Sequence, residues 1–219
     1  NGELNVTIPT KFQSAYVNSF ISACAANGIP TNPDYNGVSQ HGSNLVQSTI
    51  KNGKRDSGAT AFLKPILNRK NLTAISFAQV EKIIFEDKKA IGVKYRKGNK
   101  LIKVNTKKEI ILSAGAFQSP QLLMLSGIGE TLELNKHGIR TIHELKGVGK
   151  NLQDHLFFPV CAQSKTQEGI NHYIPLLKQL KAAWNYFVHR KGVFCTGPLE
   201  GMAFFDLNLK GGKVNFQFH

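Results

Sequence analysis

Apolar residues near the start of the chain recur with the spacing of a helix. Between residues 10 and 27 they form one stripe, which is typical of a helix that buries one face. Thr10 is suited to cap the start of this helix, and Gly28 can end it in a left-handed conformation. The stripe consists of Phe12, Tyr16, Val17, Phe20, Ile21 and Cys24.

The next segment, residues 32–58, is rich in Asn, Gly and Ser, which is typical of a loop. It contains a predicted tight turn at residues 51–54. A short helix is expected over residues 57–67, and it should stop near Pro65 because proline lacks the backbone N–H that a helix interior requires.

From residue 72 onward the period of the apolar positions changes to two, which predicts strands. Polar turns at residues 86–89 and 97–100 separate short alternating segments, so we expect an antiparallel meander. The predicted strands cover residues 72–77, 79–86, 90–96 and 101–105.

Residues 110–112 form an unbroken apolar run, which predicts a strand over residues 109–112 that is covered on both faces. Small residues follow it. Ser119 and Pro120 are residue types favoured at the cap and at the first position of a helix. We therefore expect a buried strand that leads through residues 113–116 into a helix.

The remaining pattern predicts three further elements. A short helix over residues 131–137 precedes a strand over residues 139–145. Residues 174–191 form an amphipathic helix that Gly192 should end, and we expect its apolar stripe to lie in the core. That stripe consists of Leu176, Leu177, Leu180, Trp184, Phe187 and Val188.

Composition argues against several classes of protein. No segment has the roughly 18 apolar residues that a membrane-spanning helix requires. The net charge is +14, but Lys and Arg are spread along the chain, so a basic surface is favoured over a nucleic-acid-binding site. The three cysteines lie far apart without the spacing of metal ligands, so we expect no metal site.

Two places have residues suited to chemistry. The small residues at 113–116 between a strand and a helix allow a phosphate to approach backbone N–H groups, although close packing of strand and helix requires the same residue types. Asp154 and His155 could form an acid–base pair, or they could be hydrogen-bonded loop residues. No Ser/His/Asp set follows from spacing.

Several segments together resemble the glucose–methanol–choline (GMC) oxidoreductase family, and within it the insect glucose-dehydrogenase-like branch. Residues 113–129, Ser-Ala-Gly-Ala-Phe-Gln-Ser-Pro-Gln-Leu-Leu-Met-Leu-Ser-Gly-Ile-Gly, are similar to the second sequence signature of that family. Residues 147–155, Gly-Val-Gly-Lys-Asn-Leu-Gln-Asp-His, are similar to the segment that follows it. Shorter likenesses occur in the family's order at residues 34–37, 52–57 and 69–72.

The resemblance implies an α/β protein. One part would belong to a Rossmann-like FAD-binding domain of the glutathione-reductase type with a β-meander, and the other to an α+β substrate domain with an antiparallel sheet. The implied division has a substrate-domain strand, helix and connecting loop in residues 1–58. The FAD-binding portion would cover residues 59–155, and a truncated substrate-domain portion residues 156–219.

The resemblance also implies which residues contact FAD. Val80 would contact the adenine end through its backbone. Ser113, Ala114 and Gly115 would lie against the adenosine–pyrophosphate part. Three further residues would lie near the domain junction: Asn151, Asp154 and His155.

The family's glycine-rich FAD loop and its C-terminal segment with the catalytic histidine have no counterpart in this sequence, and Asn1 is not an initiator Met. We therefore expect an internal piece of a longer enzyme, inactive by itself, whose catalytic residue lies outside the chain. The resemblance implies that the parent oxidises CH–OH groups of a sugar or other alcohol. A hydride would pass to FAD and electrons then to an acceptor such as a quinone.

Three alternatives stay open at this point. The chain could belong to a non-catalytic relative that keeps the fold as a binding or structural module. It could be a basic nucleic-acid-binding protein. It could also be a complete short protein, which would leave a half-built flavin domain with exposed apolar edges.

Overall fold

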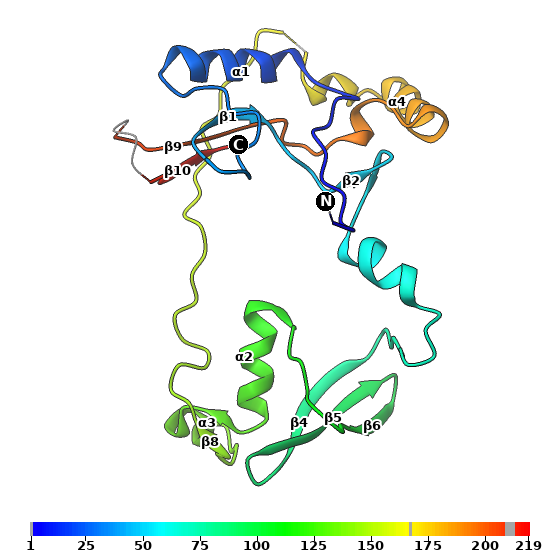
Figure 1. Cartoon of the computed structure of the whole chain (residues 1–219), viewed down its shortest axis with the longest axis vertical. Helices are drawn as coiled ribbons and strands as arrows, with labels where there is room; N and C mark the ends of the chain where they lie inside the picture. The colour runs from blue at the N-terminus through cyan, green and yellow to red at the C-terminus, as the bar shows by residue number, and fades with distance from the viewer. Residues whose placement is uncertain (1, 167, 209–212) are drawn as a thin grey trace. The chain divides into compact units, whose positions relative to one another are not determined.

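The computed structural model describes residues 2–166, 168–208 and 213–219. The chain divides into two compact units (Figure 1). Unit 1 comprises Asn1–Leu72 and Cys161–His219, and unit 2 comprises Thr73–Val160. The sequence placed domain boundaries near residues 58 and 155, and the assignment of these parts to domains stays a prediction.

A three-stranded antiparallel sheet forms the centre of unit 1 (Figure 1). Its middle strand is β9 (Gly201–Phe205), which pairs with β1 (Gly42–Leu45) on one side and β10 (Phe216–Phe218) on the other. Helix α1 (Ala15–Ala26) packs on this sheet. The buried core consists of Cys24, Ile29, Ala203 and Phe205, with Phe20 and Phe216 packed against it.

Helix α1 begins later than the sequence predicts. Gly28 ends it with a φ of +80°, as expected, but the first helical residue is Ala15, so Thr10 is not its cap. Ser14 occupies the N-cap position, and its backbone N–H donates to Oε2 of Glu200 over 2.9 Å. A residue distant in sequence therefore satisfies the helix start, and local patterns cannot show such a partner.

The turn predicted at residues 51–54 is confirmed. Strands β2 (Ile50–Lys51) and β3 (Lys54–Arg55) pair around Asn52 and Gly53, which both have positive φ. The helix predicted over residues 57–67 is present as two short irregular pieces. These are the π-helix η1 (Ala59–Leu63) and the 3-10 helix η2 (Lys64–Ile66), which contains Pro65.

Helix α4 (Leu176–His189) confirms the helix predicted over residues 174–191, and along the chain it lies between the 3-10 helices η3 (Ile170–Tyr173) and η4 (Val193–Cys195). Its end differs, because Arg190 takes the left-handed conformation and places its guanidinium over the Tyr186 ring. The predicted burial of its stripe is wrong: Trp184 is 66% exposed, and Ala182 is the buried residue of this helix. No other element of the described chain covers the large side chains of the stripe.

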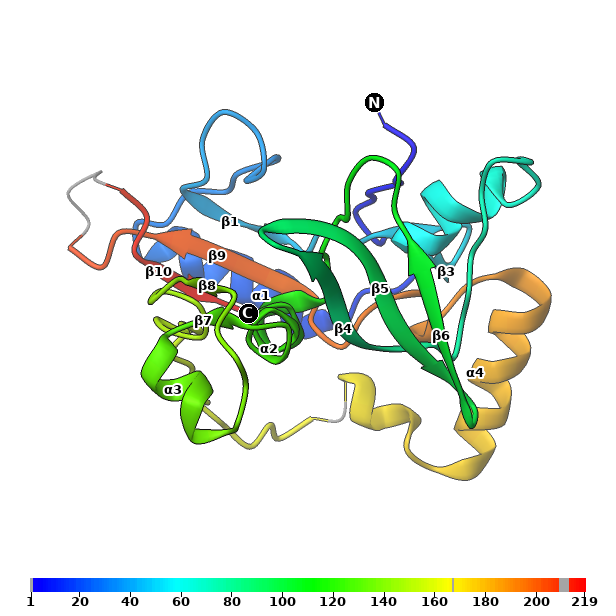
Figure 2. The same cartoon turned by 90° about the horizontal axis from the view of Figure 1, so that it is seen from below.

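Unit 2 contains the predicted meander. Strands β4 (Gln79–Glu86), β5 (Lys89–Lys97) and β6 (Lys100–Asn105) pair antiparallel in sequence order. Figure 2 shows them side by side as one twisted sheet. Asp87 and Gly98 take positive φ in the two turns, which is why short polar turns suffice.

Two predicted strands of unit 2 are not formed. None of residues 72–77 belongs to a strand, and Phe77 is highly exposed with a φ of +55°. Residues 109–112 belong to no strand, and Ile111 is 79% exposed. An apolar run becomes a buried strand only where neighbouring strands and covering layers exist, and none of the described strands lies alongside it.

Helix α2 (Gly115–Leu125) begins before the predicted cap. Ser119 and Pro120 therefore lie inside the helix, where Ser119 Oγ accepts the backbone N–H of Ala114 over 3.0 Å. Gly115 has a φ of +85°, a conformation that glycine adopts readily and that turns the chain into the helix.

A small α/β motif follows α2. Helix α3 (Thr131–Lys136) confirms the predicted helix, and Gly138 follows it with a φ of +67°. The strand predicted over residues 139–145 is limited to β8 (His143–Glu144), which pairs in parallel with β7 (Ile128–Gly129). Leu134 of α3 is almost fully buried beneath this motif.

Candidate functional site

The junction between residues 109–114 and α2 is the first candidate site. Ser113, Ala114 and Gly115 are all exposed there, so three of the four sequence-predicted cofactor residues lie together at an exposed surface. A Cβ added at Gly115 would meet no atom within 4 Å, which means that the space in front of this backbone is open. The side chains at the junction are small enough for a bulky ligand to approach the main chain.

The start of α2 suits an anionic ligand. The N-cap residue Ala114 offers no side-chain cap to the first turn, so the amides of that turn depend on other acceptors. The positive end of the helix dipole also favours a negative charge at this position. The pyrophosphate of a dinucleotide has the charge and the acceptor oxygens that such a helix start accommodates. The residues present therefore fit the phosphate part of FAD.

The two segments with the family resemblance are brought together in unit 2. A pocket of about 790 Å³ is lined by α2, from Ala116 to Met124, and by residues 147–153. Gly149 faces Met124 of α2 so closely that an added Cβ would lie 3.2 Å from its Cε. The glycine thus allows this loop to approach the helix.

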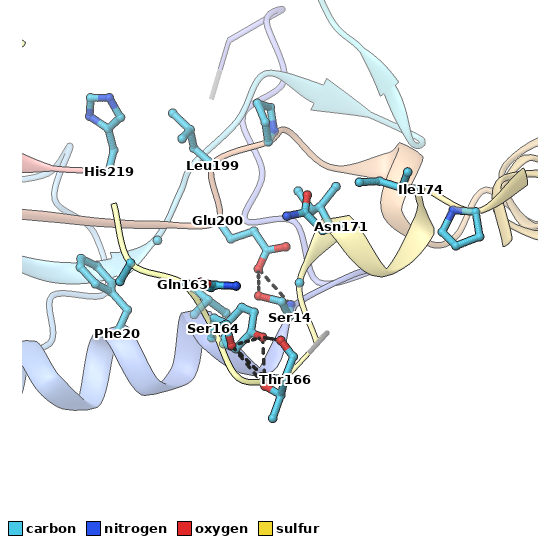
Figure 3. Close-up of a pocket in the computed structure, with 18 residues that line it drawn as sticks. Ser14, Phe20, Gln163, Ser164, Thr166, Asn171, Ile174, Leu199, Glu200 and His219 are labelled. Atoms are coloured by element: carbon cyan, nitrogen blue, oxygen red, sulfur yellow. Dashed lines mark hydrogen bonds between the residues drawn. The ribbon is translucent and has the colours of Figure 1, made fainter. Parts of the chain in front are cut away.

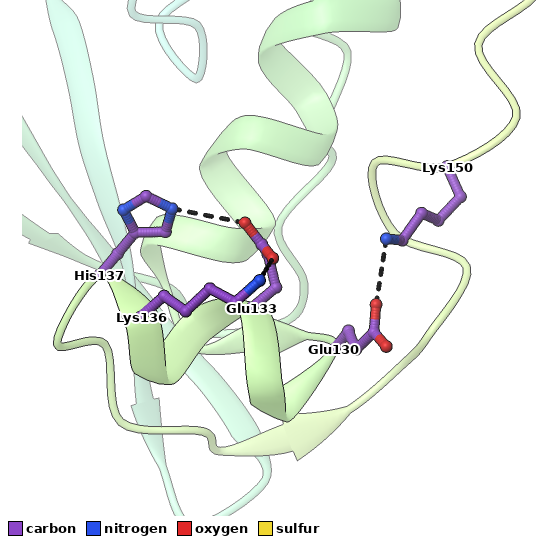
Figure 4. A network of polar contacts seen from close by, with 5 residues as sticks. All are labelled: Glu130, Glu133, Lys136, His137 and Lys150. Carbon is purple, nitrogen blue, oxygen red and sulfur yellow. Dashed lines mark hydrogen bonds and ion pairs between the residues drawn. The ribbon is translucent and has the colours of Figure 1, made fainter.

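An ion pair fastens the same loop to the start of α3. Lys150 Nζ lies 3.0 Å from Glu130 Oε2, as Figure 4 shows. On α3 itself Glu133 contacts Lys136 and His137, and the Lys136 hydrogen bond lowers the pKa of Glu133. These pairs are exposed, so each contributes little to stability, and the Lys150 ammonium that lines the pocket is already paired with Glu130.

Val80, Asp154 and His155 do not line the pocket between α2 and residues 147–153. Val80 lies in β4 at a register shift, where the backbone departs from regular pairing with β5. Its predicted backbone contact with adenine stays a prediction. Asp154 Oδ1 accepts the backbone N–H of His155 over 2.8 Å, and both residues are exposed in an extended segment. Of the two interpretations of this pair, the structure supports hydrogen-bonded loop residues over an acid–base pair, because the carboxylate accepts a main-chain N–H and does not contact the imidazole.

Unit 1 has a separate pocket of about 1070 Å³, which α1, β9 and residues near 170 line (Figure 3). Tyr16 lies on its wall, where its hydroxyl contacts Ser164 Oγ over 2.7 Å and Thr166 Oγ1 over 3.0 Å. The hydrogen bond with Ser164, which has the larger effect, and the one with Thr166 lower the pKa of Tyr16. The lining combines aromatic rings with a few polar groups, as small-molecule sites commonly do.

Glu200 is the most notable polar group of this pocket. Its Oε2 binds the backbone N–H and the hydroxyl of Ser14, over 2.9 and 2.5 Å (Figure 3). Its Oε1 is buried and has no hydrogen-bond partner among the described residues. A buried carboxylate oxygen without a donor is costly, so a ligand hydroxyl or ammonium group in this pocket would satisfy it.

The comparisons with known proteins identify the family. The family model described as GMC oxidoreductase matches residues 1–157. The chain belongs to the GMC oxidoreductase family. The expected fold class is thereby confirmed, and FAD is the cofactor of this family. The more specific insect glucose-dehydrogenase branch is not shown.

Individual relatives agree with that result. The chain is 40% identical to "Alcohol dehydrogenase [acceptor]" of Pseudomonas putida over 100% of this chain and 40% of that protein. It is 38% identical to "Oxygen-dependent choline dehydrogenase" of Rhizobium etli over 95% of this chain and 38% of that protein. An FAD-dependent oxidoreductase from Chaetomium thermophilum matches with a TM-score of 0.86 and 27% identity, over 96% of this chain and 38% of the other.

The chain thus spans about two fifths of the length of the relatives it matches. The sequence predicts the small residues at 113–115 before a helix, which the structure contains, but it does not predict the pocket with Glu200. A lone glutamate before a strand has no local pattern that marks it, because its partner Ser14 is remote in sequence. No group of three or more His, Cys, Asp or Glu in the described ranges is placed to hold a metal ion, and no described helix has the length and apolar character to span a membrane.

Proposed function

We propose that this chain is part of an FAD-dependent oxidoreductase that acts on CH–OH groups of a sugar or another small alcohol. The open junction at Ser113, Ala114 and Gly115 in a GMC family member is the observation that carries the proposal. When bound, FAD supplies the acceptor for the hydride of the alcohol carbon. The chain's own residues bind FAD and the alcohol and orient them.

Each unit has a role in this proposal. In unit 2, Ser113, Ala114 and Gly115 hold the adenosine–pyrophosphate part, and the Val80 backbone contacts the adenine end. In unit 1, the pocket with Glu200 accepts the alcohol, and Glu200 Oε1 receives a hydrogen bond from a hydroxyl or cationic group of the substrate. We assign no catalytic base to this chain and propose that a histidine elsewhere in the full-length protein takes the hydroxyl proton.

The substrate and the acceptor form the finer part of the proposal. The names of the relatives point to alcohols and choline as substrates, and they give an unspecified acceptor in one case and oxygen in the other. We propose a glucose-type substrate and a quinone acceptor. The non-catalytic alternative has no observation in its favour.

Absorption spectroscopy of the purified full-length protein tests the proposal. It predicts a bound flavin, which an alcohol bleaches and a quinone or artificial dye restores. Glucose, choline and a primary aliphatic alcohol should be compared, with dye and oxygen as competing acceptors. A full-length protein without flavin, or a flavin that none of these alcohols reduces, contradicts it.

A further inference from the structure

Three lysines lie in one straight row across the meander of unit 2. Lys82 in β4 is directly opposite Lys94 in β5, and Lys94 is directly opposite Lys103 in β6. Directly opposed residues of an antiparallel pair point to the same face of the sheet. All three lysines are exposed, so the row faces solvent. We call Lys82, Lys94 and Lys103 the lysine row.

The row is unfavourable for the sheet by itself. Like charges placed directly opposite each other destabilise a strand pair. None of the three lysines forms an ion pair with another described residue. Nearby, Glu81 lies at the bulge of β4, and its carboxylate pairs with Arg96. From Lys89 to Asn105 the hairpin contains no Asp or Glu at all. Glu81 and Glu86 of β4 therefore compensate only part of the sheet's positive charge, and none of it at the three lysines.

The opposite face of the meander is the one that packs against the rest of unit 2. Ile83 and Tyr95, which alternate with the lysines, are buried. Helix α2 contacts β4, and Ser126 at its end hydrogen-bonds Ile83. The lysine row thus lies on the exposed face of a sheet whose other face is packed, and it remains open for a partner.

The shape of the row decides which anion it fits. Neighbouring strands lie about 4.8 Å apart, so the three Cα positions follow a line roughly 10 Å long. A linear polyanion can meet every cation of such a line. The two rows that flank it contain no aromatic side chain onto which nucleic-acid bases could stack: one consists of Gln79, Arg96 and Leu101, and the other of Ile84, Gly92 and Asn105.

We propose that the lysine row binds a sulfated polysaccharide. Each ammonium group would contact a sulfate along the chain, and the neighbouring amide side chains would contact its hydroxyl groups. Sulfate is a permanent anion, so the contact persists across the physiological pH range and weakens as salt screens it. The like-charge cost within the sheet is relieved when the polymer is bound.

Binding of the purified full chain to heparin tests the proposal. The row variant carries Lys82→Gln, Lys94→Gln and Lys103→Gln. The matched control carries Lys70→Gln, Lys108→Gln and Lys213→Gln, which removes the same charge at exposed lysines outside the row. A cation at an anionic surface contributes about a fivefold factor, so the row variant should bind on the order of 100-fold more weakly. The control should stay close to the wild type.

Other probes exclude the competing partners. Chemically desulfated heparin should not bind, while DNA and phosphatidylserine vesicles at equal charge concentration should bind more weakly than heparin. Equal losses in the row variant and the control would overturn the proposal, because they would show that overall charge suffices. Stronger binding to DNA or vesicles would overturn it too. The single variant Lys94→Gln, expected to bind about fivefold more weakly, keeps the test decisive if the triple variant is poorly folded.

Discussion

The hydroxyl of Ser126 accepts the backbone N–H of Ile83 over 2.8 Å and donates to the Leu122 carbonyl over 2.6 Å. Ser126 ends α2, and Ile83 lies in the middle of β4, so one side chain joins the helix to the meander. Ser126 is fully buried. We expect the position of the α2 start, and with it the junction proposed to hold FAD, to depend on this connection.

The Ser126→Ala variant should therefore lose stability. Removing the hydroxyl leaves the Ile83 N–H buried without an acceptor, which costs about 1–3 kcal/mol. Urea unfolding monitored by circular dichroism measures the change. The control Ser113→Ala, at an exposed serine, should change the free energy of unfolding by less than about 0.5 kcal/mol. Equal stabilities of the two variants would show that the hydroxyl does not connect helix and sheet.

Glu200 offers a second test, this time in unit 1. Glu200→Ala removes the acceptor at the start of α1 and should cost about 0.5–2 kcal/mol, as loss of a helix cap does. Glu200→Gln keeps an oxygen for the Ser14 N–H and should retain most of the stability. Thermal unfolding of both variants checks this, and a Glu200→Ala protein as stable as the wild type would refute the capping role.

Acid stability should depend on Asp56. The backbone N–H of Asn5 and the hydroxyl of Thr60 donate to its carboxylate and lower the pKa of Asp56. A lowered folded-state pKa stabilises the fold above the unfolded value of about 3.9, and that contribution is lost as the pH falls through the folded-state pKa. Asp56→Asn should be less stable than the wild type at neutral pH. The difference should shrink in acid, and a constant difference in pH-dependent urea unfolding would contradict the assignment.

Some features of this chain follow from local sequence and others do not. The meander was predictable because alternation and turn residues such as Asp87 and Gly98 lie within a few positions of each other. The start of α2 was not, because Ser119 Oγ accepts the Ala114 N–H from inside the helix and Gly115 supplies an unusual backbone conformation. The cap of α1 was equally hidden, since Glu200 is 186 positions from Ser14.

Exposure was the least predictable property. The stripe with Trp184 has the spacing of a buried helix face, and Ile111 lies in a run typical of a covered strand, yet both are exposed. Periodicity shows which residues share a face, but burial depends on what packs against that face. Small residues before a helix were predicted at residues 113–115, and the structure has them exposed there, while their contact with FAD stays a prediction.

The lysine row has a consequence for the free protein. Lys94 is opposed by a like charge on both sides, so Lys94→Thr should raise the free energy of unfolding by about 0.2–1 kcal/mol. Threonine is also well suited to a strand. Urea unfolding at low and high salt measures this, with a smaller gain at high salt because salt screens the repulsion. A loss of stability at both salt concentrations would show that the lysines do not repel.

The central claim is that the junction at the start of α2 holds FAD. Ala114→Leu enlarges an exposed side chain there without requiring a positive φ, and Ala25→Leu makes the same change on an exposed face of α1. The most direct measurement is the affinity of the full-length protein for FAD, followed by flavin absorbance and fluorescence after dialysis. The account predicts that Ala114→Leu weakens FAD binding at least about tenfold, which corresponds to 1.4 kcal/mol, while Ala25→Leu binds as the wild type does. Wild-type affinity in Ala114→Leu would contradict it.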